Sequence, residues 1–147
     1  MVGKVLAVAN EKGGVGKTTC SVQIGYELAE WGKKVCIIDN DPSGDATTAF
    51  CGENIPDSIK LGNKPEAVSN TIKLYTADSE FSPLEVAKNL FLMGCTDALS
   101  VLKGADMEPA YEFCDSIEIL REKFDYIIID CPPSFGLLFT SAMLASV

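Results

Sequence analysis

The sequence predicts an α/β fold in which a mostly parallel sheet lies between two layers of helices. Short apolar runs bounded by turn residues indicate buried strands over 4–10, 34–39, 72–77 and 125–130. Segments with apolar residues at helical spacing separate several of these runs. Strands that alternate with helices favour parallel pairing through right-handed crossovers, so we expect a three-layer sandwich.

Start and stop residues locate the predicted helices. A helix is predicted over 18–31, where apolar residues recur at helical spacing before Gly32. Ser82, Pro83 and Glu85 form a capping box with proline at the first helical position, which predicts a helix that ends at Gly94.

The remaining elements are predicted from composition and periodicity. Residues 40–71 are rich in Asn, Asp, Gly, Ser and Pro and are expected to be mainly loop. A short helix is predicted over 97–103 and another over 137–144. The helix after Pro109 has one apolar face, formed by Phe113, Ile117, Leu120 and Phe124.

Composition limits the class of protein. A chain of 147 residues with 47% hydrophobic residues can bury one core, so residues 1–147 are expected to form a single domain. No run reaches the roughly 20 apolar residues of a membrane helix, and a cytoplasmic location is expected. The net charge of −9, concentrated in residues 51–147, argues against DNA binding by this stretch alone.

Cysteine and histidine usage restricts the chemistry. The six cysteines form no CxxC pair and histidine is absent, so neither a disulfide framework nor a zinc site is predicted. Without histidine, catalysis must use carboxylates, lysines, a metal ion or the backbone.

The segment KGGVGKTT (12–19) lies between a predicted strand and a predicted helix. The strict phosphate-loop pattern fails because Glu11 stands where its first glycine is required. Glycine N–H groups, the helix N-terminus and Lys17 would still bind phosphates, and the Thr18 hydroxyl would bind Mg²⁺. An ordinary glycine-rich turn is the alternative. The predicted nucleotide-binding residues are Gly13, Gly14, Val15, Gly16, Lys17, Thr18 and Thr19.

Three aspartates are candidate partners of this loop. Asp39 and Asp130 each end a predicted strand, so both are expected at the carboxyl edge of the sheet as metal ligands together with Thr18. Asp130 would hold the water shell of the metal ion. Asp41 is the candidate that orients an attacking water, because no Gln or His lies nearby in the sequence. A turn cap is the alternative role for Asp130, and an Asx-turn before Pro42 is the alternative for Asp41.

The chain resembles the deviant Walker A ATPases of the ParA/MinD group, in the chromosome and plasmid partitioning branch. The resemblance rests on KGGVGKTT (12–19), DNDPSGDAT (39–47) and FDYIIIDCPPSFGLL (124–138) in the order of the family. It implies a P-loop NTPase fold, a slow ATPase that uses ATP and Mg²⁺, a homodimer formed on ATP, and a stimulating protein similar to ParB.

The resemblance also implies roles for particular residues. Lys12 would reach the nucleotide of a second subunit and act with Lys17 and Asp41 in catalysis; a solvated turn lysine is the alternative. Asp41 would lie in the first switch, and 131–136 would form the second. Relatives that share an iron–sulfur cluster invite comparison with Cys131, but one thiol is too few to predict a cluster.

The length departs from the family pattern. The chain ends about where a further strand is expected, so we expect a fragment or a shortened protein with an open sheet edge beside Asp130. Two other functions remain open at this point. One is a metabolic P-loop ligase or phosphotransferase, and the other is a nucleotide-binding interaction module that does not hydrolyse ATP.

Overall fold

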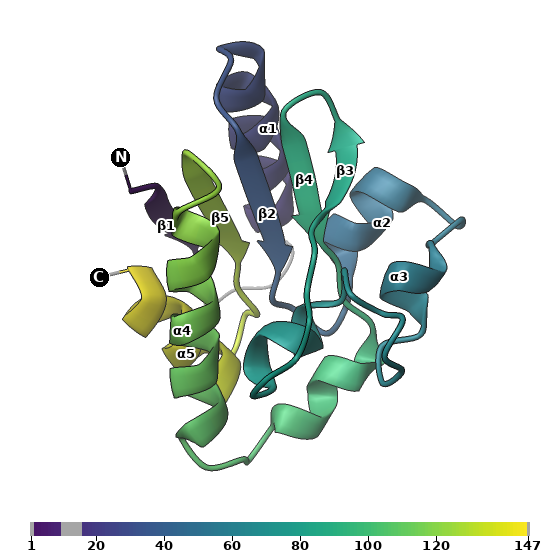
Figure 1. The fold of residues 1–147 in the computed structure, drawn as a ribbon, viewed down its shortest axis with the longest axis vertical. Helices are drawn as coiled ribbons and strands as arrows, with labels where there is room; N and C mark the ends of the chain where they lie inside the picture. Colours follow the sequence, from purple (N-terminus) through teal and green to yellow (C-terminus); the bar gives the residue numbers. More distant parts are fainter. Residues whose placement is uncertain (1, 10–15, 147) are drawn as a thin grey trace.

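Five strands form one sheet in the computed structural model, which describes residues 2–9 and 16–146 (Figure 1). Their spatial order is β1 (Lys4–Val8), β5 (Tyr126–Asp130), β2 (Val35–Asp39), β4 (Leu90–Met93) and β3 (Leu84–Ala87). The first four are parallel, and β3 is antiparallel to β4. The predicted mostly parallel sheet is therefore confirmed.

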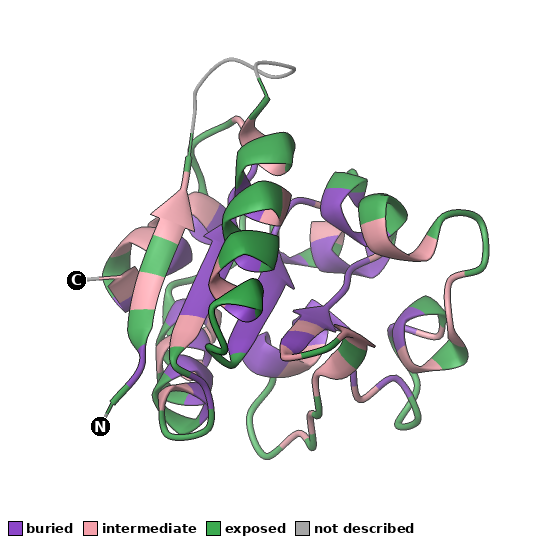
Figure 2. Cartoon of the chain, turned by 90° about the horizontal axis from the view of Figure 1, so that it is seen from above, coloured by how far each residue is buried: buried purple, intermediate pink, exposed green. Residues whose placement is uncertain are grey.

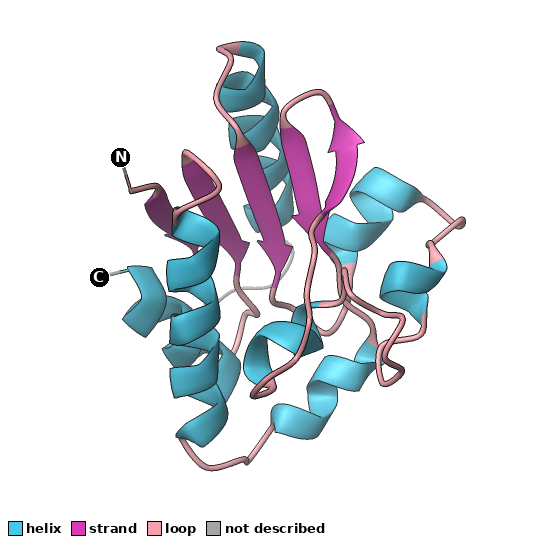
Figure 3. Cartoon of the chain, in the orientation of Figure 1, coloured by secondary structure: helices cyan, strands magenta, loops and turns pink. Residues whose placement is uncertain are grey.

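Helices cover both faces of this sheet (Figure 3). The α-helices are α1 (Lys17–Glu30), α2 (Asp45–Cys51), α3 (Asp57–Lys60), α4 (Glu108–Arg121) and α5 (Leu137–Ser146), and the 3₁₀ helices are η1 (Thr71–Tyr75) and η2 (Asp97–Leu102). α1 lies behind the sheet in the view of Figure 1, whereas α4 and α5 lie in front. This arrangement is the predicted three-layer sandwich. Among the described residues, no helix is long and apolar enough to cross a membrane.

The central strands bury side chains on both faces, as Figure 2 shows by their colour. In β2, Ile37 joins the core under α1, whereas Ile38 joins the core under α4. The apolar face predicted for the helix after Pro109 is confirmed, because Phe113 and Ile117 are fully buried. Burying each such side chain contributes about 1.5–3 kcal/mol to folding.

The predicted strand over 72–77 is wrong, because this segment begins with the 3₁₀ helix η1. The side-chain oxygen of Asn70 accepts a hydrogen bond from the Ile72 N–H at 3.0 Å and caps this helix. Ile72 and Leu74 are both buried and lie two residues apart, which is the spacing of apolar residues on one face of a strand. The place beside β2 that a third parallel strand would occupy is taken by β4.

The predicted helix from Ser82 to Gly94 is also wrong, because this segment forms the β3–β4 hairpin. Asn89 adopts a positive φ of 64°, which closes the turn between the strands. Leu90 and Leu92 are fully buried. The capping pattern involves only residues 82–85, and the pairing of β4 with β2 decides the conformation of the rest of the segment.

The open edge expected beside Asp130 is not found there. β5 lies inside the sheet, and Asp130 is in register with Val8 of β1 on one side and Asp39 of β2 on the other. Within the described residues, β1 and β3 are the outer strands. The segment expected to be loop over 40–71 contains the short helices α2 and α3.

Candidate functional site

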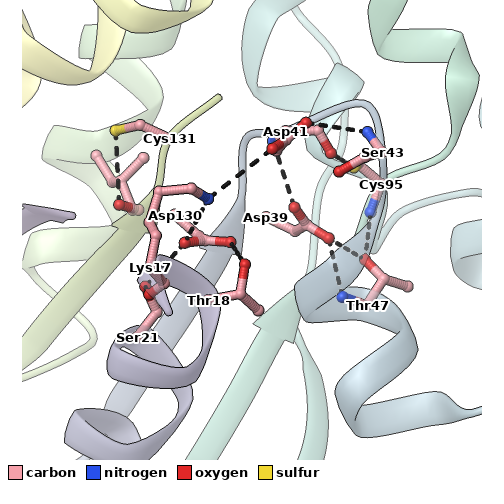
Figure 4. A network of polar contacts seen from close by, with 11 residues as sticks. Lys17, Thr18, Ser21, Asp39, Asp41, Ser43, Thr47, Cys95, Asp130 and Cys131 are labelled. Carbon is pink, nitrogen blue, oxygen red and sulfur yellow. Dashed lines mark hydrogen bonds and ion pairs between the residues drawn. The ribbon is translucent and has the colours of Figure 1, made fainter. Parts of the chain in front are cut away.

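The carboxyl ends of β2 and β5 meet the start of α1 at one edge of the sheet, as Figure 4 shows. Gly16 precedes α1 with a positive φ of 82°, a conformation that glycine adopts without strain. Asp39 and Asp130 are directly opposite each other in the ladder. The structure therefore places both strand-end aspartates at the same edge of the sheet, as the sequence predicted, and Asp130 contacts Lys17.

Lys17 extends from α1 between two carboxylates. Its Nζ lies 3.0 Å from Oδ1 of Asp130 and 3.8 Å from Oδ2 of Asp41. The side chains of Lys17, Asp41 and Asp130 are only 9%, 11% and 0% exposed, so water screens these ion pairs weakly. The described residues thus place one buried ammonium group where two acidic segments converge.

Two hydroxyl groups of α1 complete the environment of Asp130. Thr18 Oγ1 donates a hydrogen bond to Oδ2 at 2.8 Å, and Ser21 Oγ donates to Oδ1 at 2.9 Å. Ser21 was missed by the sequence analysis, although it lies four residues after Lys17 and therefore on the same helix face. Asp130 is thus held by three side chains of one helix.

Asp39 has different partners, although it too is fully buried. Its Oδ2 accepts hydrogen bonds from the Thr47 N–H at 2.8 Å and the Thr47 hydroxyl at 2.6 Å, and its Oδ1 accepts from the Asp41 N–H at 3.3 Å. Burial raises the pKa of Asp39 to about 7 despite these donors. Its carboxylate is hydrogen-bonded to α2, whereas that of Asp130 is hydrogen-bonded to Thr18 of α1.

Asp41 makes the Asx-turn contact considered as its alternative role and still faces the site. Its Oδ1 accepts a hydrogen bond from the Ser43 N–H at 3.0 Å, which is the contact of an Asx-turn, while its Oδ2 faces Lys17. The turn therefore fixes the carboxylate and does not remove it from the site.

A cavity of about 440 Å³ opens beside these groups. Its lining includes Gly16, Lys17, Thr18, Thr19, Asp41 and Pro133. A helix N-terminus and a buried ammonium group at one cavity favour an anionic ligand. A neighbouring cavity of about 410 Å³ shares Asp41 with the first and extends to Lys103 and Phe135.

Several predicted residues cannot be placed. Lys12, Gly13, Gly14 and Val15 lie outside the described residues. Their predicted contacts with phosphate, and the predicted role of Lys12 at a second subunit, stay predictions.

The donor set next to the cavity fits Mg²⁺ bound together with phosphates. Thr18 and Asp130 supply one hydroxyl and one carboxylate at 2.8 Å from each other. Mg²⁺ commonly uses one or two carboxylates with substrate phosphates and water, and does not need an all-protein cage. Residues 2–9 and 16–146 contain no group of three or more His, Cys, Asp or Glu side chains arranged to hold a metal ion.

Cys131 follows Asp130 but is fully buried. Burial, with the nearby Asp130 charge, raises the pKa of its thiol to about 12. In the metal-free chain the thiol is therefore protonated at neutral pH.

A family model described as an AAA domain matches residues 3–147. The chain is 34% identical to the sporulation initiation inhibitor protein Soj of Bacillus subtilis (strain 168) over 99% of its own length and 56% of that protein. It is 32% identical to the chromosome partitioning protein ParA of Myxococcus xanthus (strain DK1622) over 99% of its length and 50% of that protein. The chain thus spans about half the length of these relatives.

Solved structures give the same picture of the fold. Cobyrinic acid a,c-diamide synthase from Mycobacterium smegmatis, with a bound ATP analog and magnesium, superposes with a TM-score of 0.80. It is 30% identical in sequence, and the match covers 99% of this chain and 57% of that one.

Proposed function

The chain belongs to the ParA/MinD family of P-loop proteins, and on this premise we propose that it is an ATP-binding switch that hydrolyses ATP with Mg²⁺. The observation that carries the proposal is the position of Lys17. Its ammonium group lies between Asp130 and Asp41, and Lys17 lines the cavity at the start of α1. The bound ATP analog and magnesium of the diamide synthase support this assignment.

Lys17 would exchange partners when nucleotide binds. Its Nζ is shared by two carboxylates, and triphosphate oxygens would replace one or both of them as acceptors. Thr18 and Asp130 would then hold Mg²⁺ through the hydroxyl group and through water, and the ion would supply neutralisation of the phosphate charge. Asp39, the third predicted metal ligand, would act from farther away, since its oxygens are bonded to Thr47 and Asp41.

Asp41 is the proposed group that orients the attacking water. The Ser43 N–H fixes one of its oxygens, and the other faces the cavity side of Lys17. Release of Lys17 to the phosphates would free this second oxygen to accept a hydrogen bond from water. Hydrolysis would therefore depend on a carboxylate whose orientation is set by its own turn.

The wider role follows from the relatives and from the motifs. We propose ATP-driven dimerisation in which Lys12 contacts the nucleotide of the partner subunit, stimulation by a protein similar to ParB, and a cytoplasmic role in plasmid or chromosome partitioning. Residues 1–147 would act as one nucleotide-binding domain.

A metabolic ligase or phosphotransferase is the second candidate. It is favoured by the second cavity of about 410 Å³, which adjoins the first at Asp41 and would suit a small-molecule substrate. The structural likeness to the diamide synthase also supports it. The sequence DNDPSGDAT (39–47), which is similar to the partitioning branch, favours the switch.

The proposal is tested by measuring phosphate release from ATP by the purified chain in the presence of Mg²⁺. We expect slow hydrolysis without any added metabolite, and a roughly 100-fold loss in Asp41→Ala with nucleotide binding retained. Asp57→Ala is the matched control, because Asp57 is an exposed residue in the first turn of α3. Binding without hydrolysis in the unsubstituted chain would favour the interaction module, and turnover that requires a small molecule would favour the ligase.

Light scattering coupled to size exclusion tests the dimer. We expect the chain to dimerise in ATP and Mg²⁺ but not in ADP, and Lys12→Ala to bind ATP yet remain monomeric. Equal dimerisation of Lys12→Ala and the unsubstituted chain would refute the role of Lys12 across the interface.

A further inference from the structure

We propose that Thr47 and Cys95 are positioning residues that hold the Asp39–Asp41 segment in place for hydrolysis. Together they form what we call the β4 clamp, which joins the start of α2 and the end of β4 to this segment. The inference rests on the proposed function, because Asp41 is taken there as the group that orients water. Neither clamp residue lines the phosphate cavity, so both would act through the aspartates.

Thr47 bonds to Asp39 through both of its donors. Its N–H and its hydroxyl donate to Oδ2 of Asp39 at 2.8 and 2.6 Å, and its Oγ1 also accepts a hydrogen bond from the Cys95 N–H at 2.9 Å. Thr47 is 1% exposed, so water cannot replace these contacts. A hydroxyl that both donates and accepts is required here, which serine would supply and valine would not.

Cys95 contacts the same segment at a second point. Its Sγ donates to the carbonyl oxygen of Asp41 at 2.8 Å, while its N–H donates to Thr47. Burial raises the pKa of this thiol, which keeps the proton that the hydrogen bond needs. Figure 4 shows Cys95 between Asp41 and Thr47. Cys95, two residues after β4, thus bonds to Asp41 and Thr47 at the two ends of the segment 41–47.

The strand ends approach closely enough for this contact because residue 94 has no side chain. A Cβ added to Gly94 would lie 3.1 Å from Thr47 Oγ1 and 2.7 Å from Ile59 Cδ1. The hydroxyl of Thr71 also lies within 2.9 Å of the Asp39 carbonyl and 3.0 Å of the Met93 carbonyl. The ends of β2 and β4 are therefore bridged from two sides.

These contacts fix the main chain that carries the Asp41 carboxylate, whose own oxygens accept from the Ser43 N–H and face Lys17. The Asp41 N–H is bonded to Asp39, and its carbonyl oxygen accepts hydrogen bonds from the Cys95 thiol and from the Gly44 N–H at 2.9 Å. The Asp41 Oδ2 atom lies 3.8 Å from Nζ of Lys17. Rotation of this peptide would move the carboxylate away from that ammonium group. Because small misplacements of a reacting group reduce rates strongly, loss of the clamp should lower kcat more than it weakens ATP binding.

Steady-state hydrolysis by conservative variants tests the clamp. We expect Thr47→Val to lower kcat at least roughly tenfold with KM changed less than about threefold, and Thr47→Ser to restore kcat to within about threefold of the unsubstituted chain. Thr48→Val is the matched control, because Thr48 is the next residue of α2 and is exposed. A folded Thr47→Val protein with unchanged kcat would overturn the proposal.

Cys95→Ala is the second variant, and it decides the question if Thr47→Val does not fold. It removes the thiol donor but keeps the N–H bond to Thr47, so a smaller fall in kcat is expected, about threefold to tenfold. The double variant Thr47→Val/Cys95→Ala should show a coupled, non-additive effect. A kcat in Cys95→Ala equal to that of the unsubstituted chain would contradict the clamp.

Amide hydrogen exchange separates this proposal from the proposed function. In the nucleotide-free chain we expect exchange over 41–47 to be at least about tenfold faster in Cys95→Ala, and unchanged in Thr48→Val. If the unsubstituted chain fails to hydrolyse ATP but exchange responds in this way, the function is wrong and the clamp stands. Unchanged exchange in a chain that hydrolyses ATP would refute the clamp alone.

Discussion

Asp39 and Asp130 are the same residue at equivalent places in adjacent strands, yet their surroundings differ. They are in register at the ends of β2 and β5, and both are fully buried. Asp130 is bonded to an ammonium group and two hydroxyls, all from α1. Asp39 is bonded to uncharged donors, from Thr47 in α2 and from the Asp41 backbone.

The difference shows that the neighbouring helix, and not the strand, decides which partners each carboxylate has. α1 supplies a cation, so the region around Asp130 is built to exchange charged partners. α2 supplies none at Asp39, and burial raises the pKa of this carboxyl group to about 7. We infer that the Asp130 region binds ligand, whereas the Asp39 region holds the backbone of the segment that follows β2.

The largest effect is expected where the charge is removed from the Asp130 region. Lys17→Ala leaves a buried carboxylate without its cation, which should reduce the free energy of unfolding by about 3–5 kcal/mol. It should also weaken ATP binding by at least roughly 100-fold, because charge-assisted hydrogen bonds to phosphate are lost. Thermal unfolding and titration with a fluorescent ATP analogue measure the two effects.

Lys123→Ala is the control for this substitution, since Lys123 is exposed and precedes β5, at the end of that strand opposite Asp130. It should leave stability and affinity within error of the unsubstituted chain. If Lys17→Ala bound ATP as tightly as this control, the assignment of the phosphate site would be wrong.

A pH profile is the next test, because it addresses Asp39 alone. The unfolded chain binds the Asp39 proton only below about pH 4, whereas the folded chain retains it up to about pH 7. Proton uptake therefore stabilises the folded state below pH 4, and this contribution is lost as the pH rises towards 7. Compared with Asp39→Asn, the unsubstituted nucleotide-free chain should lose up to about 1.4 kcal/mol of unfolding free energy for each unit by which the pH rises in this window.

Urea unfolding at steps across the same window measures this difference. Asp57→Asn serves as control, because Asp57 is exposed and should give a profile parallel to that of the unsubstituted chain. Parallel profiles for Asp39→Asn as well would show that burial does not govern the titration of Asp39.

The smallest effect is expected from a single hydroxyl of the Asp130 region. Ser21→Ala removes one donor to a buried carboxylate, which should cost about 1.5 kcal/mol of unfolding free energy. Cys20→Ala, at the exposed neighbouring position of α1, should change it by less than about 0.5 kcal/mol. Equal stabilities of the two variants would mean that Lys17 and Thr18 are sufficient to stabilise the buried carboxylate of Asp130.

The elements predicted correctly are those whose pattern is strong over their own length. β2 and β5 are runs of buried aliphatic residues, and α4 has an apolar stripe, so local periodicity is enough to identify them. η1 and the β3–β4 hairpin were missed because their conformation depends on distant partners. Leu90–Met93 is a strand because it forms backbone hydrogen bonds with β2. The capping box at Ser82 is a local pattern and cannot indicate this pairing.

The sequence by itself determined the family and the places of the strand-end aspartates, and it predicts the phosphate-loop chemistry, because glycines, a lysine and a threonine at close spacing act within one local segment. Only the tertiary structure decided which partner each aspartate has. Lys17 and Asp130, which are in contact, are 113 residues apart in the chain, and Thr47 and Cys95 are 48 residues apart. Such contacts arise from the order of strands and the packing of helices, which no local pattern of residues contains.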